Sequence, residues 1–359
     1  MSEDVLLETR GPVGLVTLNR PQALNALNLG MCRAMDPQLR AWADDDRVRA
    51  VVIRGAGGRA FCAGGDVRAV AASLSGPATV GSEPLSRAFF RAEYALNHLI
   101  HHYPKPFIAL VDGVCMGGGL GLSAHGAFRV VTERLMLSMP ETAIGLFPDV
   151  GGGWFLPRFP GEMGTYLGLT GARCDAADAR WLGYATHQIA ASRLEDVLAA
   201  LVDADWQGAA MDVVARVLAG SAADSGVSPL RARVEDIARC FSADRVEDIL
   251  RALEAERSEW AEQTRATLMR MCPMSLKVTL RQLRMGRGGD YDAMVPVEYR
   301  LSQALTARAD FREGIRAVLV DKDQKPRWSP ASLDAVSEDA VDACFAQNPS
   351  DSFAPAAVR

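Results

Sequence analysis

The chain lacks the cysteine pairs that disulfide frameworks and zinc sites need. Its seven cysteines are odd in number, scattered, and never spaced as C-x-x-C. This usage predicts reduced thiols, no disulfide framework and no metal, as in a cytoplasmic protein. The acidic start Met-Ser-Glu-Asp lacks the charged and then apolar leader of a signal or transit peptide, which also favours a cytoplasmic location.

No stretch of the sequence is apolar enough to predict a membrane span, and neither sign of charge dominates. The most apolar segment, residues 107–128, contains Asp112, a glycine run and His125, so we expect a buried strand and helix there. The net charge of −5 argues against a nucleic acid or an anionic membrane as a partner. A hydrophobic content of 49% is ordinary for a soluble globular protein.

Strand and helix patterns alternate in the first half of the chain. The β-type runs cover residues 5–7, 14–18, 50–54, 107–111 and 128–131, and the helical patterns cover residues 29–44, 84–101 and 118–125. The turn signal Gly11-Pro12 predicts a hairpin between the first two runs. Alternating elements predict an α/β fold of ββα or βαβ units around a mixed or parallel sheet.

Beyond about residue 190 the pattern is almost entirely helical. The helical stretches are residues 194–204, 211–218, 246–270, 275–284 and 293–305. We therefore predict three parts: a core of residues 1–190, a helical region of residues 191–330, and a polar tail of residues 331–359. One short helical patch is expected in the tail, at residues 338–345.

Two glycine runs that flank two isolated carboxylates are the most informative feature. Glu141 and Asp149 lie between residues 113–119 and 151–153, and residues 135–157 contain no other charge. Glycines after an apolar strand allow close approach of a ligand to backbone N–H groups. Carboxylates in apolar loops are candidate bases or nucleophiles, because desolvation raises their pKa. Together these groups indicate an enzyme of acyl chemistry.

The glycines have two other interpretations. Residues 119–124 match the G-x-G-x-x-G/A fingerprint of nicotinamide-binding proteins, with Glu141 20 residues beyond Gly121. That acidic residue does not end the next strand, however, which argues against a dinucleotide site. Close helix–sheet packing without any ligand is the other alternative.

Other reactive residue types have weaker patterns. His98, His101 and His102 cluster near a predicted helix end, and His98 and His102 are spaced for a metal, but no third ligand is evident. We therefore interpret them as cap or surface histidines. Cys62 has no histidine nearby in the sequence and is interpreted as a packing residue.

These segments resemble the crotonase (enoyl-CoA hydratase/isomerase) superfamily. The matching segments are Asn19-Arg20-Pro21, Leu24-Asn25-Ala26-Leu27, Phe61-Cys62-Ala63-Gly64-Gly65-Asp66, Gly113-x-x-Met116-Gly117-Gly118-Gly119 and Met139-Pro140-Glu141. Within the superfamily the chain is most similar to the 3-hydroxyisobutyryl-CoA hydrolases. Their pattern matches residues 90–94, 140–153, 185–187, 273–279, 310–317 and 321–323. The likeness covers roughly residues 5–330.

The resemblance implies a crotonase-like spiral of ββα units with a helical C-terminal region. It also implies an oxyanion hole formed by the N–H groups of Gly65 and Gly118. By the same likeness Glu141 and Asp149 are catalytic and contact the substrate, and Glu93 binds the acyl group. The segment that binds coenzyme A (CoA) is implied to include Ala63, Asp66, Arg59 and Arg68.

One departure from the hydratases distinguishes the subfamilies. Hydratases carry a second glutamate two residues after the triple glycine, where this chain has Gly121. The resemblance therefore implies hydrolysis of an acyl-CoA thioester in valine breakdown, with CoA as part of the substrate and no separate cofactor. A hydratase or isomerase that uses the same pocket and a non-catalytic acyl-CoA-binding protein are the alternatives. Relatives often form trimers or hexamers, so a homo-oligomer is expected.

Overall fold

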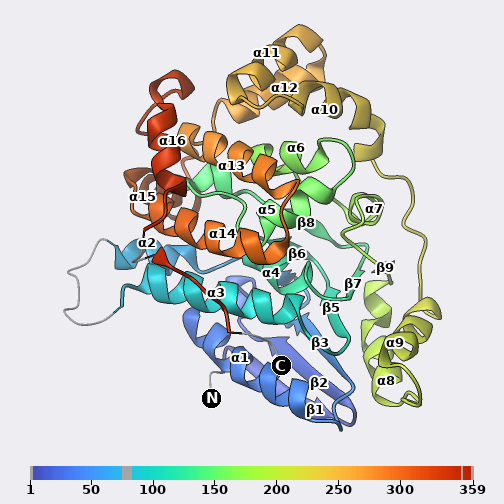
Figure 1. The fold of residues 1–359 in the computed structure, drawn as a ribbon. Helices are drawn as coiled ribbons and strands as arrows, with labels where there is room; N and C mark the ends of the chain where they lie inside the picture. The colour runs from blue at the N-terminus through green and yellow to red at the C-terminus, as the bar shows by residue number, and fades with distance from the viewer. Residues whose placement is uncertain (1–2, 75–82, 349–350, 357–359) are drawn as a thin grey trace.

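The computed structural model describes residues 3–74, 83–348 and 351–356 as a spiral of strands and helices with further helices stacked on it (Figure 1). The main sheet has the strand order β1 (Val5–Arg10), β2 (Val13–Leu18), β3 (Ala50–Gly55), β5 (Phe107–Val111), β7 (Phe128–Val131) and β9 (His187–Gln188). The second sheet consists of β4 (Ala60–Cys62), β6 (Val114–Met116) and β8 (Met136–Ser138). The hairpin β1–β2 is antiparallel, and the other neighbouring strands run parallel.

Each turn of the spiral places one strand in the main sheet and the next in the second sheet. After β3 and β4 come helices α2 (Val67–Ser73) and α3 (Leu85–His101), and after β5 and β6 comes α4 (Gly118–Ser123). In the third turn, β7 and β8 lead into a short 3-10 turn at Glu141–Ile144. This repeating order is the ββα spiral predicted from the sequence. It brings the ends of β4, β6 and β8 side by side.

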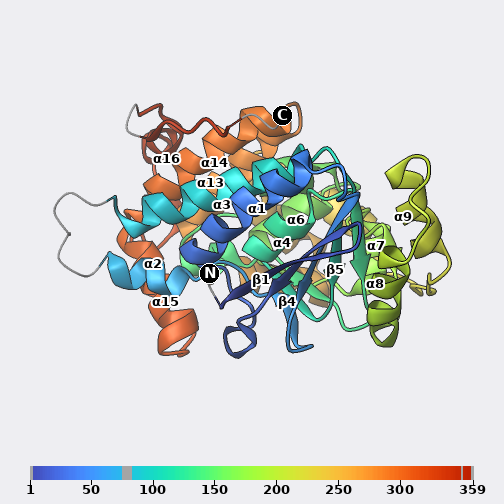
Figure 2. The same ribbon diagram turned by 90° about the horizontal axis from the view of Figure 1, so that it is seen from below.

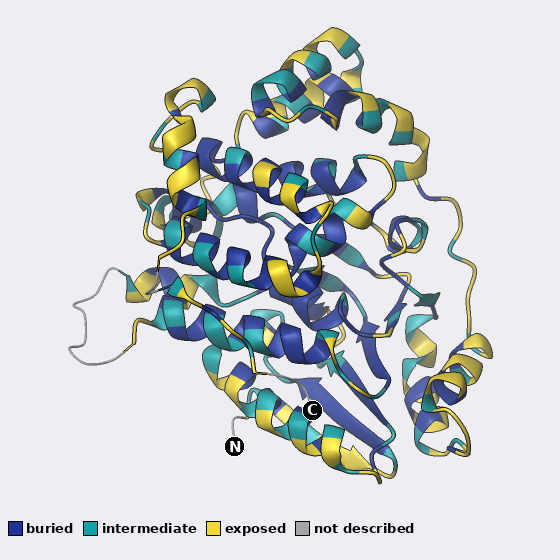
Figure 3. Cartoon of the chain, in the orientation of Figure 1, coloured by how far each residue is buried: buried dark blue, intermediate teal, exposed yellow. Residues whose placement is uncertain are grey.

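The main sheet is covered on both faces (Figure 2). Side chains alternate along its strands, so Val51 and Ile53 join the core beneath α1 (Leu29–Asp44) and α3, whereas Val52 joins a second core. Helices α8 (Leu194–Val202) and α9 (Ala210–Ala219) supply the other side of that second core. The strands other than the edge strand β1 are accordingly buried along most of their length, while the outer helices expose one side (Figure 3).

The remaining helices include counterparts of those predicted over residues 275–284, 293–305 and 338–345, together with others that the sequence pattern did not predict. They are α5 (Gly152–Phe155), α6 (Met163–Thr170), α7 (Ala176–Trp181), α10 (Val234–Phe241), α11 (Val246–Glu256), α12 (Glu259–Leu268), α13 (Pro273–Gly286), α14 (Tyr291–Thr306), α15 (Ala309–Ile315) and α16 (Glu338–Phe345). The single helix predicted over residues 246–270 is wrong. Arg257 adopts a left-handed φ of 55°, which ends α11, and the Ser258 side chain accepts a hydrogen bond from Ala261 N to begin α12.

The C-terminal helices pack directly on the spiral. In Figure 1, α14 lies alongside α3, and both α13 and α14 contact α5; residues of both regions belong to one hydrophobic core. The division at residue 190 is therefore not a gap in the packing, and the division of the chain into three parts stays a prediction. None of the described helices has the length and hydrophobicity that crossing a lipid bilayer requires.

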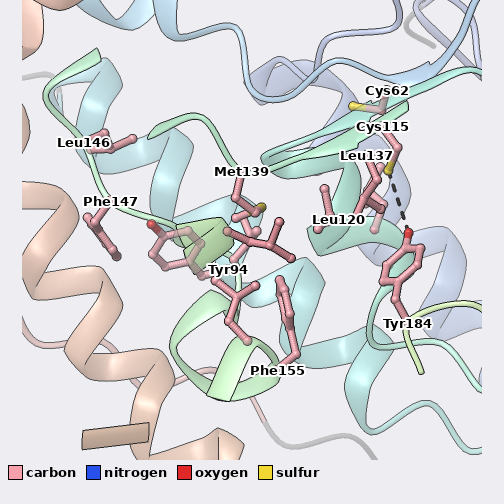
Figure 4. Close-up of a cluster of buried hydrophobic side chains, with 14 of the residues drawn as sticks. Cys62, Tyr94, Cys115, Leu120, Leu137, Met139, Leu146, Phe147, Phe155 and Tyr184 are labelled. Atoms are coloured by element: carbon pink, nitrogen blue, oxygen red, sulfur yellow. Dashed lines mark hydrogen bonds between the residues drawn. The ribbon is translucent and has the colours of Figure 1, made fainter. Parts of the chain in front are cut away.

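The core around α4 contains sulfur and hydroxyl groups among apolar side chains (Figure 4). Ser123 Oγ and Tyr184 Oη are 2.6 Å apart, and Cys115 Sγ lies 3.8 Å from the same Tyr184 hydroxyl. These buried polar atoms satisfy one another, which limits the cost of burying them. Leu120 and Leu137 fill the space beside them and fix α4 against the second sheet.

We predict that Gly286→Ala destabilises the protein. A Cβ atom at residue 286 would overlap the carbonyl oxygen of Gly153, so α13 and α5 would have to separate. Overpacking of this kind costs about 1–3 kcal/mol in the free energy of unfolding. Urea denaturation measures this change. Gly288→Ala is the matched control, because nothing lies within 4 Å of a Cβ atom there. Equal stability of both variants would contradict the packing described.

Candidate active site

A pocket of about 180 Å³ lies where the turns of the spiral meet the C-terminal helices. Its lining consists of Ala63, Gly64, Gly65, Val67, Phe89, Phe90, Glu93, Met116, Gly117, Gly118, Pro140, Glu141, Ala143, Ile144, Leu146, Asp149, Val318 and Leu319. This lining is apolar apart from three carboxyl groups and exposed backbone. Because sites for drug-sized ligands measure about 300–1,000 Å³, the pocket suits a short acyl group.

Two glycine segments form one wall of the pocket. A Cβ atom at residue 118 would lie 3.2 Å from Gly65 N and would overlap Glu93 Oε1. Gly118 is the first residue of α4, so its N–H group has no acceptor within the helix. The backbones of Gly65 and Gly118 thus lie close together, a side chain at either residue would overlap Phe89 or Glu93, and both N–H groups are available to an anionic oxygen.

The segment after β4 is held in place by the loop that precedes α1. Leu27 N donates to Gly64 O at 2.9 Å, and Asp66 N donates to Leu27 O at 2.7 Å. The backbone of Asn25 has a positive φ of 58°, and its side-chain amide donates a hydrogen bond of 2.8 Å to Ala60 O. These bonds explain why the residue 24–27 motif accompanies the glycine motif in the sequence: the loop fixes the position of Gly65 N.

Three carboxyl groups converge on the pocket close to the glycine segments. Glu93 comes from α3, Glu141 begins the 3-10 turn after β8, and Asp149 lies just before α5. Glu93 Oε1 and Glu141 Oε2 are buried and make no hydrogen bond to any described residue. Buried oxygens without partners are rare in native proteins, so these two point to a ligand in the pocket.

Burial changes the acidity of these groups. Burial, and then the charges of Asp149 and Glu141, raise the pKa of Glu93 well above its usual value. Burial and the charge of Asp149 likewise raise the pKa of Glu141. The pKa of Asp149 rises to about 6, again chiefly through burial. Since the described lining residues include no cation, the three groups must retain protons at pH values where exposed carboxyls are ionised.

Tyr94 distinguishes Asp149 from the other two carboxyls. Its hydroxyl donates a buried hydrogen bond of 2.7 Å to Asp149 Oδ2, which lowers the pKa of that carboxyl. Tyr94 lies one residue after Glu93 on α3, surrounded by the core side chains of Figure 4. It is a positioning residue that the sequence did not reveal, because an aromatic residue in a helix also fits ordinary core packing.

A second buried network fixes the loop after Asp149. Glu298 of α14 accepts hydrogen bonds from Gly151 N at 2.7 Å and Gly153 N at 2.8 Å. Gln282 of α13 donates to Glu298 at 3.0 Å and to Pro148 O at 2.9 Å. Burial raises the pKa of Glu298 to about 8. No sequence pattern indicates the contact between Glu298 and these glycines, since more than 140 residues separate the partners.

The predicted site residues divide into two groups. Six line the pocket: Ala63, Gly65, Glu93, Gly118, Glu141 and Asp149. Asp66 instead caps α2, accepting from Ala69 N at 3.2 Å and pairing with Arg20 at 3.1 Å. Arg59 and Arg68 are exposed and outside the pocket lining. A CoA-binding role for these three residues stays a prediction.

The structure also shows the surroundings of Gly119, Gly121 and Cys62, for which the sequence allows other interpretations. A Cβ atom at Gly119 would overlap Cys62 O, and one at Gly121 would lie 2.8 Å from Asn97 and Val150. These two glycines therefore serve close packing of α4, and the dinucleotide fingerprint is incidental. Cys62 is buried, and burial raises the pKa of its thiol, as expected of a packing residue.

Comparison with known proteins assigns the chain to a family. A model of the enoyl-CoA hydratase/isomerase family matches residues 13–345, and the chain belongs to that family. The mitochondrial 3-hydroxyisobutyryl-CoA hydrolase of Danio rerio is 46% identical over 95% of this chain and 89% of its own length. The mitochondrial enzyme of the same name from Homo sapiens is 44% identical over 94% of this chain and 87% of its own length.

Two solved structures share the fold over nearly the whole chain. A carnitinyl-CoA dehydratase from Mycobacterium thermoresistibile has a TM-score of 0.89 and 40% identity, with 97% of this chain and 98% of that chain covered. An enoyl-CoA hydratase from Rhodobacter sphaeroides has a TM-score of 0.88 and 36% identity, with 98% and 99% covered. The crotonase-like fold predicted from the sequence is confirmed.

The cytoplasmic location predicted from the sequence is contradicted. The 3-hydroxyisobutyryl-CoA hydrolases that this chain resembles are mitochondrial by name. The error has a physical origin, because unpaired cysteines indicate a reducing compartment and do not distinguish one reducing compartment from another.

We predict that Glu93→Gln raises the thermal stability of the protein at high pH. The unfolded chain releases the Glu93 proton near the ordinary pKa, whereas the folded chain retains it to higher pH. Stability is therefore lost as pH rises above the unfolded pKa, at about 1.4 kcal/mol per unit of difference between the two pKa values. The amide removes this loss, so the gain in Tm over the wild type should increase from pH 5 to pH 8.

Glu254→Gln, at an exposed position of α11, is the control for this experiment. Its Tm should follow the wild type at each pH. A Glu93→Gln variant whose Tm difference from the wild type is independent of pH would show that Glu93 does not hold a proton in the folded protein.

Proposed function

We propose that this protein hydrolyses the thioester of 3-hydroxyisobutyryl-CoA, or of a close short β-hydroxyacyl-CoA, to the free acid and CoA. The reaction belongs to valine breakdown. Its main support is the single pocket that combines two glycine N–H groups with three buried carboxyls. The identity of 44–47% to 3-hydroxyisobutyryl-CoA hydrolases over about 95% of the chain supports the same activity.

In this proposal, the N–H groups of Gly65 and Gly118 bind the thioester carbonyl oxygen. Negative charge develops on that oxygen as the carbonyl is attacked, and preorganised donors stabilise it where water is excluded. Loss of one such donor typically lowers the rate by about 10²–10³. The retained proton of Glu93 matters here, because an ionised carboxylate beside Gly118 would repel the developing charge.

Glu141 is the group that acts on the thioester. Its raised pKa makes the ionised form a stronger base than an exposed glutamate. The ionised group either attacks the carbonyl carbon to form a mixed anhydride, which water then hydrolyses, or removes a proton from an attacking water. Both routes break the carbon–sulfur bond and release CoA as its thiolate, which takes up a proton.

Asp149 and Glu93 complete the proposed site. Asp149, held by Tyr94, orients the attacking water or returns a proton to the departing sulfur. Glu93 hydrogen-bonds the substrate hydroxyl through its otherwise unpartnered oxygen. A buried partner for that hydroxyl favours β-hydroxyacyl groups, because an acyl group without the hydroxyl would leave it unpaired.

Hydration or dehydration of an acyl-CoA is the second candidate. It is favoured by the similarity to structures described as a carnitinyl-CoA dehydratase and an enoyl-CoA hydratase. It is opposed by residue 121, where Asn97 and Val150 occupy the space that a glutamate side chain would need. Asp149 or Glu93 would then have to replace the missing carboxylate.

In this proposal CoA is part of the substrate, so the reaction requires no separate cofactor. The phosphates of CoA would lie outside the acyl pocket, where Arg59 and Arg68 stay the predicted contacts. Assembly into a trimer or hexamer is carried over as a prediction from the family resemblance.

The direct test compares two activities of the purified protein. Thiol release from 3-hydroxyisobutyryl-CoA and hydration of crotonyl-CoA are measured side by side. We expect rapid thiol release with negligible hydration, because Gly121 removes the second hydratase carboxylate. Glu141→Gln should abolish thiol release and retain CoA binding, since the amide preserves the shape of the pocket but is neither nucleophile nor base.

Glu133→Gln is the matched control, because Glu133 is exposed and outside the pocket lining. Its thiol release should equal that of the wild type. Hydration without thiol release would replace the proposal with the second candidate. Binding of the CoA thioester with neither reaction would indicate a non-catalytic acyl-CoA-binding protein.

A further inference from the structure

Three metal-ligating side chains meet at the contact between α3 and α14, outside the pocket lining. His98 and His102 lie at the C-terminal end of α3, and Asp292 lies in the first turn of α14, 190 residues beyond His102. Asp292 Oδ1 is 3.1 Å from His98 Nε2 and 2.7 Å from His102 Nε2. Asp292 is the third ligand that the sequence did not show.

The geometry is compatible with coordination of one small ion. Residues four apart face the same side of a helix, and one potential ligand atom from each of His98, His102 and Asp292 lies within 4.8 Å of the other two. In a tetrahedral zinc site, with bonds of about 2.0–2.2 Å, neighbouring ligand atoms are about 3.3 Å apart. Small side-chain rotations therefore suffice to bring the three atoms around an ion.

The surroundings also permit an ion to enter. Asp292 has a side-chain exposure of 58% and His102 of 38%, whereas His98 is nearly buried. Solvent thus has access on one side and can complete the coordination shell. Arg40 of α1 is close enough for its positive charge to act on His98. Asp36, 3.0 Å from Arg40, offsets that charge.

The neighbouring histidines have other contacts. His101 stacks on Tyr291 with ring centroids 4.0 Å apart, and its Nδ1 faces Nδ1 of His125 at 3.4 Å. His125 Nε2 lies 2.8 Å from Val150 O, so it supports the loop that carries Asp149. His98 and His102 also contact this aromatic group through their rings, with centroids 6.2 Å apart for His98 and Tyr291 and 4.8 Å apart for His102 and His101.

We propose that His98, His102 and Asp292 bind a divalent transition-metal ion such as Zn²⁺. Two imidazole nitrogens and one carboxylate oxygen suit zinc and its neighbours rather than magnesium or calcium, which prefer oxygen ligands alone. A metal ion competes with protons for imidazole nitrogens, so its affinity falls as pH falls. Three protein ligands leave one position for water.

The proposed ion would connect the two helices that hold Asp149. Helix α3 carries Tyr94, which binds Asp149, and α14 carries Glu298, which binds the glycines that follow it. An ion at the far end of both helices would fix their relative position without contacting the substrate. This role is structural and does not depend on the hydrolase proposal.

Isothermal titration of ZnCl₂ into tag-free, chelator-treated protein tests the site. We expect one Zn²⁺ to bind per chain and to raise Tm, because a ligand of the folded state stabilises it. His102→Ala and Asp292→Asn should each weaken binding about tenfold or more, since even supporting groups around a metal contribute about 10–100-fold. Both positions are partly exposed, so the variants should fold normally, which circular dichroism without zinc checks.

His187→Ala is the matched control, because His187 lies in β9 and contacts Thr186. It should bind zinc as the wild type does. Failure of the wild type to bind zinc would overturn the proposal. Equal zinc binding by the wild type, His102→Ala and Asp292→Asn would also overturn it, because the ion would then occupy another site.

Discussion

The burial of three carboxyl groups in one small pocket, whose described lining residues include no cation, is the constraint that the rest of the structure has to accommodate. Glu93, Glu141 and Asp149 share a water-poor space, and each has a pKa raised chiefly by burial. Such an arrangement opposes folding at neutral pH and would be removed by selection for stability alone. Its persistence is understandable if the pocket exists to act on a substrate that it binds through these groups.

The rest of the fold holds these three groups and the two glycines in their positions around the pocket. The spiral brings the ends of β4, β6 and β8 together, which places Gly65, Gly118 and Glu141 on three adjacent segments. Helix α3 adds Glu93 from the side and holds Asp149 through Tyr94. The C-terminal helices then close the structure, since Glu298 and Gln282 hold the loop between Asp149 and α5. Groups held by such supporting bonds need little rearrangement during a reaction.

Much of this was predictable from the sequence because its signals are local. Alternating strands and helices indicated the ββα spiral, and glycine runs next to isolated carboxylates indicated the pocket. Tyr94, Glu298 and Asp292 were not predictable, because each acts on a partner more than 50 residues away. The break at Arg257 was missed because an arginine in the left-handed region gives no sequence signal. The predicted cytoplasmic location was wrong because cysteine usage indicates whether a compartment is reducing and does not identify the compartment.

Glu93 is expected to retain its proton in the folded protein at pH values where an exposed glutamate is ionised. Infrared spectroscopy of the wild type and Glu93→Gln at pH 7 measures this most directly, because a protonated carboxyl has a carbonyl band distinct from that of a carboxylate. The account predicts a carboxylic-acid band in the wild type that loses intensity in Glu93→Gln and is unchanged in Glu254→Gln. Identical acid bands in all three proteins would show that Glu93 is ionised and would contradict the account.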